Sequence, residues 1–326
     1  MVIVPTLSGA FVPWFVGYRI AALEDLVPRG EPRNTIVLVA QRSHSISEES
    51  AEVMTINAVQ TRTTEVNGCA FAYRETGPEG GVPVVFLHHL TAVLDDWDPA
   101  VVDAIAAERR VVLLDNRGVG RSEGETPDTI EAMADDVIAF LEAAGIGQAD
   151  LLGLSMGGMV AQVVAHRRPE LVRRLVLAGT TPAGDPGPSN GPALLHDAFA
   201  WAAKEGRHPK HYLFFRQTPD SQAAGDAFLA RLDERTEDRD VPASEATIGA
   251  QLTALAKWEL ESKPVAVPHP TLVVNGDDDV MVPTLSSFTL ATLMPNAQLS
   301  IYPNSGHAAV FQYPELFSAQ VLTFLS

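Results

Sequence analysis

The sequence predicts an α/β protein whose doubly wound, mostly parallel sheet carries an inserted helical cap. Three observations predict this class: apolar runs of strand length recur after residue 63, helical patterns separate them, and one long helical segment interrupts the alternation. The chain has 326 residues, a length that suits two domains or one large α/β domain with an insertion. The order of the patterns favours the single domain with an insertion.

The first regular elements are predicted to form a hairpin. Thr63–Val66 and Phe71–Arg74 flank Asn67-Gly68, a dipeptide that suits a tight turn because both residues tolerate positive φ. The later strands are continuous apolar runs, which are typical of parallel strands covered by helices on both faces. They occupy residues 82–87, 111–114, 151–154, 175–178 and 271–274.

Helical spacing of apolar residues marks the segment from Ile130 to Ala144. Thr126 is expected to cap this helix, Pro127 to occupy its first turn and Gly145 to end it. A helix between two buried strands implies a right-handed crossover, and repeated crossovers imply a parallel sheet with helices on both faces.

The alternation stops in residues 181–264, which are predicted to form a helical cap. This segment opens with the Pro- and Gly-rich stretch TPAGDPGPSNGP and continues as helices near 194–204, 223–235 and 245–260, without a strand signal. Helices inserted after a strand are expected to cover the carboxyl edge of the sheet, where α/β proteins bind ligands. Residues 61–180 and 265–326 then form the core.

Residues 1–60 are expected to form a poorly ordered extension upstream of the fold. The first 18 residues carry no charge, but no Lys or Arg precedes them and Pro5 and Pro13 interrupt them, which disfavours a signal peptide or a membrane anchor. Met54 lies just before the first strand pattern and is a candidate start of translation.

The charge balance excludes some partners. Lys and Arg number 23 against 41 Asp and Glu, for a formal net charge of −18, which repels nucleic-acid phosphates and anionic lipid headgroups. Neither nucleic acid nor a membrane is therefore an expected partner. The single cysteine, Cys69, can form no intrachain disulfide and no thiolate metal cage, which favours a reducing, cytoplasmic location.

The most informative motif is Gly153-Leu154-Ser155-Met156-Gly157, which fits the pattern G-x-S-x-G between an apolar strand and a helical pattern. In such a strand-to-helix turn the serine is held in a strained conformation, and the small glycines let neighbouring backbone approach closely. The serine side chain then projects beyond the strand end. Ser155 is therefore the candidate nucleophile.

A serine hydroxyl needs a base to take its proton, and in this architecture the order along the chain is serine, acid, histidine. Asp279 ends an acidic turn after the strand 271–274, and His307 lies in the loop between a predicted strand and the last helix. Both side chains are expected at the same sheet edge as Ser155. Asp277 and Asp278 leave the acid ambiguous, and Asp279 is preferred because it immediately precedes Val-Met-Val-Pro.

Two other interpretations of the polar motifs are weaker. The three consecutive aspartates 277–279 resemble a divalent cation site, but consecutive side chains rarely converge on one ion, so no metal is expected. The loop DNRGVGRS at 115–122 is rich in glycine but does not make G-x-G-x-x-G, so no dinucleotide is expected either.

A tetrahedral intermediate needs donors for its oxyanion. The backbone amide of Met156, directly after the nucleophile, is one candidate, and that of Leu90, in the loop after the strand 82–87, is the other. His88 and His89 precede Leu90 and are expected to shape this loop. Trp97 and, in the cap, Trp258 are candidate substrate-binding residues, although packing explains a tryptophan equally well.

With these residues in place, the chain from about residue 63 resembles the α/β-hydrolase superfamily. The matching segments are FLHHLTAVLDDW, LLDNRGVGRS, LLGLSMGGMVAQ, TLVVNGDDDVMVP and NSGH. The resemblance implies an eight-stranded sheet with a helical cap, a Ser155–His307–Asp279 triad and no cofactor. The chain is most similar to bacterial carboxylesterases and 3-oxoadipate enol-lactonase-like hydrolases, which usually carry His-Gly where this chain has His88-His89.

The expected activity is cofactor-independent hydrolysis of a small-molecule ester, thioester or lactone through an acyl-enzyme on Ser155. Two alternatives remain open: a perhydrolase or acyltransferase that uses the same triad, and a catalytically silent hydrolase-fold protein that only binds a ligand. Haloalkane dehalogenases and epoxide hydrolases of this fold use an aspartate nucleophile, so Ser155 argues against both. The sequence does not indicate the oligomeric state.

Overall fold

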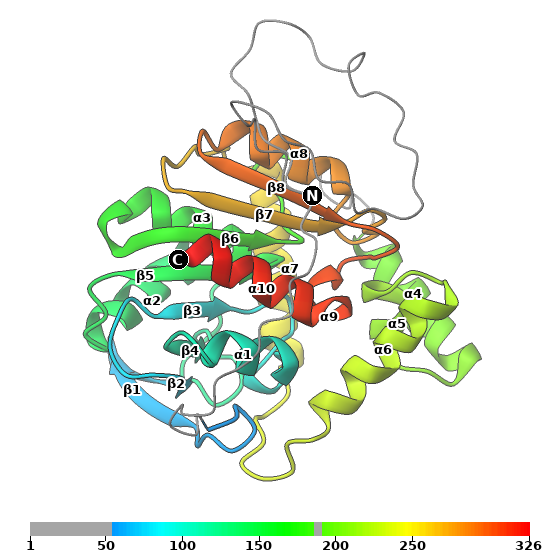
Figure 1. The fold of residues 1–326 in the computed structure, drawn as a ribbon, viewed down its shortest axis with the longest axis horizontal. Helices are drawn as coiled ribbons and strands as arrows, with labels where there is room; N and C mark the ends of the chain where they lie inside the picture. The colour runs from blue at the N-terminus through cyan, green and yellow to red at the C-terminus, as the bar shows by residue number, and fades with distance from the viewer. Residues whose placement is uncertain (1–53, 186–190) are drawn as a thin grey trace, which may run out of the picture.

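An eight-stranded sheet in the order β1-β2-β4-β3-β5-β6-β7-β8 organises the fold (Figure 1). The structure is a computed structural model, and it describes residues 54–185 and 191–326. Only β2 runs antiparallel to its neighbours, which confirms the predicted mostly parallel sheet. The strands are β1 Arg62–Val66, β2 Cys69–Thr76, β3 Val84–Leu87, β4 Val111–Leu114, β5 Ala149–Leu154, β6 Val172–Ala178, β7 Thr271–Gly276 and β8 Ala297–Tyr302.

The turn between β1 and β2 has the two-residue form that its sequence predicts. Val66 pairs directly with Cys69, so Asn67 and Gly68 alone connect the strands. Their φ angles are 50° and 84°, the left-handed region in which an Asn-Gly dipeptide is stable.

Helices cover both faces of the sheet. On one face lie α1 (Pro99–Ala106), α9 (Ala309–Gln312) and α10 (Pro314–Leu325), and on the other α2 (Ile130–Ala143), α3 (Met156–Arg167) and α8 (Thr284–Leu293). Short 3-10 turns occur at Leu94–Asp96 and Pro169–Leu171. Alternate residues of each strand enter opposite clusters: Val84 and Phe86 contact the first set of helices, and Val85 and Leu87 the second. The continuous apolar runs are therefore strands buried on both sides.

The N-cap of helix α2 lies three residues after the predicted cap. Thr129 is the N-cap, and its hydroxyl accepts a hydrogen bond from the amide of Ala132. Thr126 instead donates its hydroxyl hydrogen to the carbonyl of Gly118, 3.0 Å away, so it is occupied in the preceding loop. Gly145 follows the helix at φ 67°, as its predicted role in ending the helix requires.

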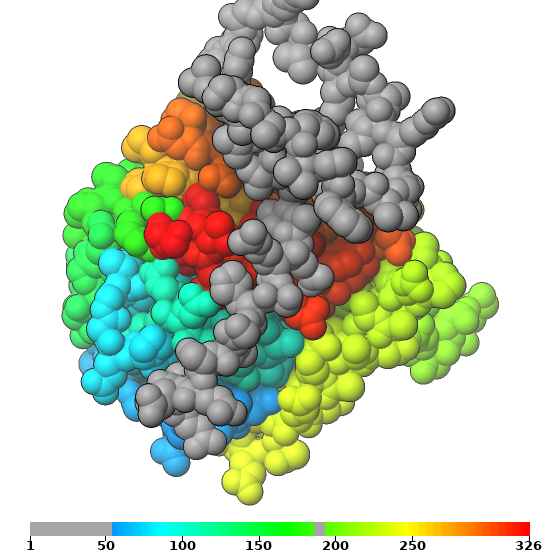
Figure 2. Space-filling model, in the orientation of Figure 1, coloured from blue at the N-terminus to red at the C-terminus, as the bar shows by residue number. Residues whose placement is uncertain are grey.

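The segment between β6 and β7 forms helices α4 (Gly191–Glu205), α5 (Lys210–Phe214), α6 (Pro219–Leu232) and α7 (Glu245–Leu260). Within residues 181–264, the described part contains no strand. Figure 1 shows α4, α5 and α6 beyond the carboxyl ends of the strands, and in Figure 2 their yellow-green atoms form the lower right of the surface. The bounds of α7 match the predicted 245–260, whereas α5 was not anticipated. Residues 186–190 of the Pro- and Gly-rich stretch lie outside the described residues.

Residues 54–60 belong to the fold, contrary to the expectation that the extension reaches residue 60. Ile56 and Val59 are each 3% exposed and pack into the core. The guanidinium of Arg235, from the cap, donates hydrogen bonds to the carbonyls of Ile56, Asn57 and Val59 at 2.9–3.0 Å. The interpretation of residues 1–53 concerns residues that the structure does not describe. Among the described residues, no helix combines the length and the apolar character needed to cross a bilayer.

Candidate active site

Ser155 occupies the turn between β5 and α3 in a strained backbone conformation. Its φ is 55° and its ψ −118°, a region that side-chain-bearing residues rarely adopt. The flanking glycines explain how the turn fits. A Cβ on Gly157 would lie 2.0 Å from the carbonyl oxygen of Leu87, and one on Gly153 would lie 2.4 Å from the carbonyl oxygen of Gly157. Helix α3 therefore approaches β3 closely because Gly157 carries no side chain, and β5 closely because Gly153 carries none.

The turns after β7 and β8 bring an acid and a histidine together. His307 Nδ1 and Asp279 Oδ2 are 2.8 Å apart, and the side chains are 1% and 0% exposed. The other oxygen, Asp279 Oδ1, accepts hydrogen bonds from the amides of Met281 at 2.8 Å and Val282 at 2.9 Å. Because the carboxylate can only accept, Nδ1 carries the hydrogen and Nε2 of His307 keeps its lone pair.

The three neighbouring aspartates have different hydrogen-bond and ion-pair partners. Asp277 accepts a hydrogen bond from the amide of Asn304 at 2.9 Å. Asp278 pairs with Arg216 of the cap, with 2.9 Å between Oδ2 and Nε. Of the three, only Asp279 contacts the histidine. Among the described residues, no group of three or more His, Cys, Asp or Glu side chains is placed to hold a metal ion.

A cavity of about 330 Å³ lies between the sheet edge and the cap, and Ser155, His307 and Leu90 all line it. His307 Nε2 is buried and has no hydrogen-bond partner within the described structure, and it makes no hydrogen bond with Ser155 Oγ. Such contacts often form only when substrate is bound. The remaining lining residues are His89, Thr91 and Met281 from the core and Leu195, Phe199, His208, Pro209, Lys210, Leu213, Phe214 and Ile248 from the cap.

The predicted oxyanion donors come from adjacent parallel strands, β3 and β5, at the point where the strand order reverses. Met156 is the first residue of α3, where backbone amides have no acceptor within the helix. The loop that contains Leu90 is held by the cap: the amide of Thr91, at φ 65°, donates to Oε1 of Gln251 in α7 at 2.8 Å.

His88 holds this loop through contacts with two other side chains, as expected of a loop-shaping residue. Its Nδ1 accepts a hydrogen bond from Trp97 Nε1 at 2.7 Å, and its Nε2 lies 3.1 Å from Asp115 Oδ1. Burial lowers the pKa of His88 to about 4, so the ring is neutral at physiological pH.

His89 is a site residue whose position the sequence reasoning missed. Its ring lines the cavity and meets Phe214 edge-on, with the ring centroids 5.2 Å apart, and Phe214 in turn lies 5.6 Å from the ring of His307. One feature of the sequence marks this position: the hydrolases that the chain resembles usually carry His-Gly where this chain has His88-His89.

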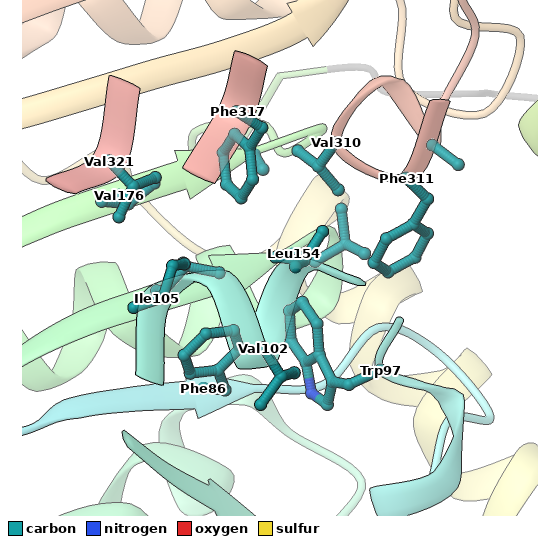
Figure 3. Packing of buried hydrophobic residues seen from close by; sticks show 14 of the residues in the cluster. Phe86, Trp97, Val102, Ile105, Leu154, Val176, Val310, Phe311, Phe317 and Val321 are labelled. Atoms are coloured by element: carbon teal, nitrogen blue, oxygen red, sulfur yellow. The ribbon is translucent and has the colours of Figure 1, made fainter. Parts of the chain in front are cut away.

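The two tryptophans do not line the cavity, so the structure does not place them at the substrate. Trp97 is 4% exposed and lies between Phe86 and Phe311 in the core, as Figure 3 shows. Trp258 is 2% exposed and packs in the cluster on the other face of the sheet. Large aromatic side chains were expected at the cavity because of their apolar area, but here that area is buried in the core. Among the aromatic residues, Phe199 and Phe214 of the cap contact the cavity instead.

Comparison with known proteins agrees with the fold. The family model described as alpha/beta hydrolase fold matches residues 82–314. An alpha/beta hydrolase fold protein from Chitinophaga pinensis is 38% identical, with a TM-score of 0.80 over 84% of this chain and 99% of that one. The putative carbamate hydrolase RutD of Rhizobium rhizogenes is 30% identical over 231 residues, which cover 70% of this chain and 87% of that protein. The enol-lactonase from Burkholderia xenovorans shares the fold at 22% identity, with a TM-score of 0.64 over 81% of this chain and 99% of that one. The chain belongs to the alpha/beta hydrolase fold family and is an enzyme of the hydrolase class.

Proposed function

We propose that the protein is a cofactor-independent serine hydrolase that cleaves a small-molecule carboxylic ester, thioester or lactone. The observation that carries the proposal is the buried His307–Asp279 pair, 2.8 Å apart, on the same cavity as the strained Ser155. A base with a fixed tautomer on the same cavity as a serine hydroxyl can activate that hydroxyl as a nucleophile. The similarity to a putative carbamate hydrolase supports acyl-group hydrolysis.

In the proposed mechanism, His307 Nε2 takes the proton of Ser155 Oγ as the oxygen attacks the substrate carbonyl. The amides of Leu90 and Met156 donate to the oxyanion, and Asp279 stabilises the imidazolium. The imidazolium then gives its proton to the leaving oxygen or sulfur, and the carbon–heteroatom bond breaks. In the second half, His307 takes a proton from water, the hydroxide attacks the acyl group, and the Ser155 oxygen regains its proton as the acid leaves.

The residues that line the cavity favour a substrate with an uncharged acyl group. Leucine, isoleucine, methionine and phenylalanine side chains form much of its wall. Lys210 is the one Lys or Arg among the lining residues, and it is paired with Asp96. The single Cys69 further supports action in a reducing, cytoplasmic compartment.

Fluorophosphonate labelling tests the proposal without knowledge of the substrate. The probe should label the wild-type protein at Ser155, and Ser155→Ala should lose labelling together with about 10⁴–10⁶ of the turnover on a short p-nitrophenyl ester. Ser287→Ala is the matched control, because Ser287 is a buried serine of α8 whose hydroxyl has no partner among the described residues. That variant should label and turn over like the wild type. Wild-type activity in Ser155→Ala would refute the proposal.

The alternatives are separated by two further measurements. A perhydrolase or acyltransferase would transfer the same acyl group to peroxide or an alcohol, so product analysis with these nucleophiles competing against water distinguishes it. A folded wild-type protein that fails to react with the probe would instead favour a ligand-binding protein without catalysis.

A further inference from the structure

His89 lines the catalytic cavity and carries a buried, unpaired ring nitrogen that the triad does not use. The residue is 5% exposed, and its ring lines the same cavity as Ser155 and His307. Its Nε2, at the end of the ring furthest from the backbone, is buried and has no hydrogen-bond partner in the described part of the chain. Buried polar atoms are nearly always paired, so an unpaired one on a ligand cavity calls for an explanation.

The neighbouring backbone fixes this nitrogen as an acceptor. His89 Nδ1 lies 2.8 Å from the carbonyl oxygen of Leu90, and because a carbonyl can only accept, Nδ1 carries the hydrogen. Burial, aided by the charge of Lys210, lowers the pKa of His89 to about 3, so the ring stays neutral in ordinary buffers. The Nε2 atom therefore presents a lone pair and no hydrogen.

The described residues around His89 leave no donor for this lone pair. The apolar ring of Phe214 packs perpendicular to the His89 ring, with 5.2 Å between the ring centroids. Lys210 is the nearest cation in the cavity wall, but its ammonium group pairs with Asp96. A buried acceptor that loses its water partner weakens binding of any ligand that cannot replace it, whereas a ligand with a matching donor recovers that loss.

We propose that His89 Nε2 accepts a hydrogen bond from an N–H or O–H group of the substrate beside the scissile carbonyl, so that the enzyme selects donor-bearing esters over their aliphatic isosteres. The position follows from the chain, because His89 is covalently adjacent to Leu90, whose amide is the proposed oxyanion donor. The inference rests on the proposed function, and it names the substrate class: carbamates and hydroxy-substituted esters. His89 is in this role a specificity-determining residue.

Two isosteric substrate pairs test which side of the ester carries the donor. On the acyl side, p-nitrophenyl N-methylcarbamate is compared with p-nitrophenyl propionate, which replaces N–H by CH₂. On the alcohol side, 2-hydroxyethyl butyrate is compared with propyl butyrate, which replaces O–H by CH₃. The measured quantity is the ratio of kcat/KM within each pair, divided by the same ratio in a His89 variant, so that intrinsic reactivity cancels.

Three substitutions separate the acceptor from the other roles of the ring. His89→Phe keeps an aromatic ring against Phe214 and removes both nitrogens. His89→Asn keeps a short donor for the Leu90 carbonyl and removes the distant acceptor, whereas His89→Gln offers an amide oxygen near the place of Nε2. In one of the two pairs, the donor-to-isostere ratio of kcat/KM should be about tenfold or more lower in the Phe and Asn variants than in wild type. In the Gln variant it should stay within about threefold of the wild-type ratio.

His269→Asn is the matched control. His269 is also a buried histidine with one unpaired nitrogen, but it precedes β7 and lies outside the cavity, so the substrate ratios should not change. Equal losses for both members of each pair in every His89 variant would overturn the proposal. A fall in His89→Gln as large as in His89→Asn would also overturn it, because packing would then explain the effect. Fluorophosphonate labelling of Ser155 checks the fold of each variant, and absence of labelling in the wild type would refute the proposed serine mechanism itself.

Discussion

Asp279 determines which nitrogen of His307 carries the hydrogen, and this single contact decides whether the histidine can act as a base. The carboxylate is itself oriented by the amides of Met281 and Val282, which both donate to Oδ1. Oδ2 is left to accept from His307 Nδ1 at 2.8 Å. The lone pair on Nε2, on the side of the cavity, is a consequence of that orientation.

We predict that Asp279→Asn lowers turnover by about 10⁴ while the fold is retained. The asparagine carbonyl can replace Oδ1 as the acceptor for the two amides, which places the amide NH₂ group against His307. An NH₂ group donates, so His307 Nδ1 must accept, and the hydrogen moves to Nε2, where it blocks proton transfer from Ser155. Steady-state kinetics on a p-nitrophenyl ester measure the turnover, and the thermal midpoint Tm of each variant shows whether the fold is retained.

Asp278→Asn is the control for this substitution. Asp278 has the same side chain one position earlier, but it pairs with Arg216 and does not contact the histidine. Its exposed ion pair contributes little, so activity should stay within about threefold of wild type. Equal activity losses in the two variants would contradict the assignment of Asp279.

At the residue scale, the sequence predicts the positions with a local signature and leaves alternatives open where only contact distinguishes neighbours. Ser155 is identified by the glycines that its turn requires. The choice among three consecutive aspartates is not local, because it depends on which side chain the turn after β7 directs toward His307. Trp97 was placed wrongly because its size predicts burial but not whether the ring faces the core or the cavity.

At the element scale, two glycines show why the same residue type has opposite consequences in two helices. Gly157 lies in the first turn of α3, where an added Cβ would lie 2.0 Å from the backbone oxygen of Leu87. Gly249 is an exposed residue inside α7, and an added Cβ there would have no atom within 4 Å. Close packing determines the effect of an added side chain at Gly157, whereas intrinsic helix propensity determines that effect at Gly249.

We predict that Gly157→Ala abolishes activity and lowers stability, because strand β3 must move away from α3 to admit the methyl group. Overpacking of this kind costs about 1–3 kcal/mol, and it displaces the Ser155 turn and the loop after β3 together. Gly249→Ala should instead raise the free energy of unfolding by about 0.5–1 kcal/mol with unchanged kcat. Denaturant unfolding and ester kinetics on both variants check the contrast, and a fully active Gly157→Ala would contradict it.

The elements that the sequence predicts well are those with continuous or strictly periodic apolar patterns. The buried parallel strands and α7 appear where their patterns place them. Residues 54–60 were missed because they form no helix or strand and contribute only two side chains, Ile56 and Val59, to the core. What orders them is distant in sequence: Arg235, a cap residue, donates hydrogen bonds to their carbonyls.

At the scale of the whole molecule, a pair of carboxyl groups joins the cap to the core. Asp115 follows β4 and is buried, and Asp240 lies in the cap between α6 and α7. The amide of Leu94 donates to both, 3.0 Å from Asp115 Oδ1 and 3.3 Å from Asp240 Oδ2, so the two carboxyl groups are neighbours. The amide of Asp240 also donates to Asp95, which pairs with Arg74 at 2.6 Å.

This arrangement makes the attachment of the cap depend on pH. Burial and the proximity of the other carboxyl group raise the pKa of Asp240 to about 7, and burial raises that of Asp115 to about 7. Both values lie above the ordinary aspartate value of 3.8, so between about pH 4 and pH 7 the folded protein binds more protons than the unfolded chain. Stability from this pair is therefore present below pH 4 and is lost progressively as pH rises to 7.

We predict that Asp240→Asn stabilises the protein at pH 8 relative to pH 5, because asparagine stays neutral beside Asp115 and the repulsion disappears. The difference in Tm between variant and wild type should be about 2–4 °C larger at pH 8 than at pH 5.

Asp238→Asn is the control of opposite sign. Partial burial raises the pKa of Asp238, but hydrogen bonds from the Thr61 amide and from Arg121 hold that pKa at about 2. Its stabilising contribution is lost only as pH falls from about 4 to 2, so Asp238→Asn should lower Tm equally at pH 5 and pH 8. A Tm difference for Asp240→Asn that is the same at both pH values would contradict the raised pKa of Asp240.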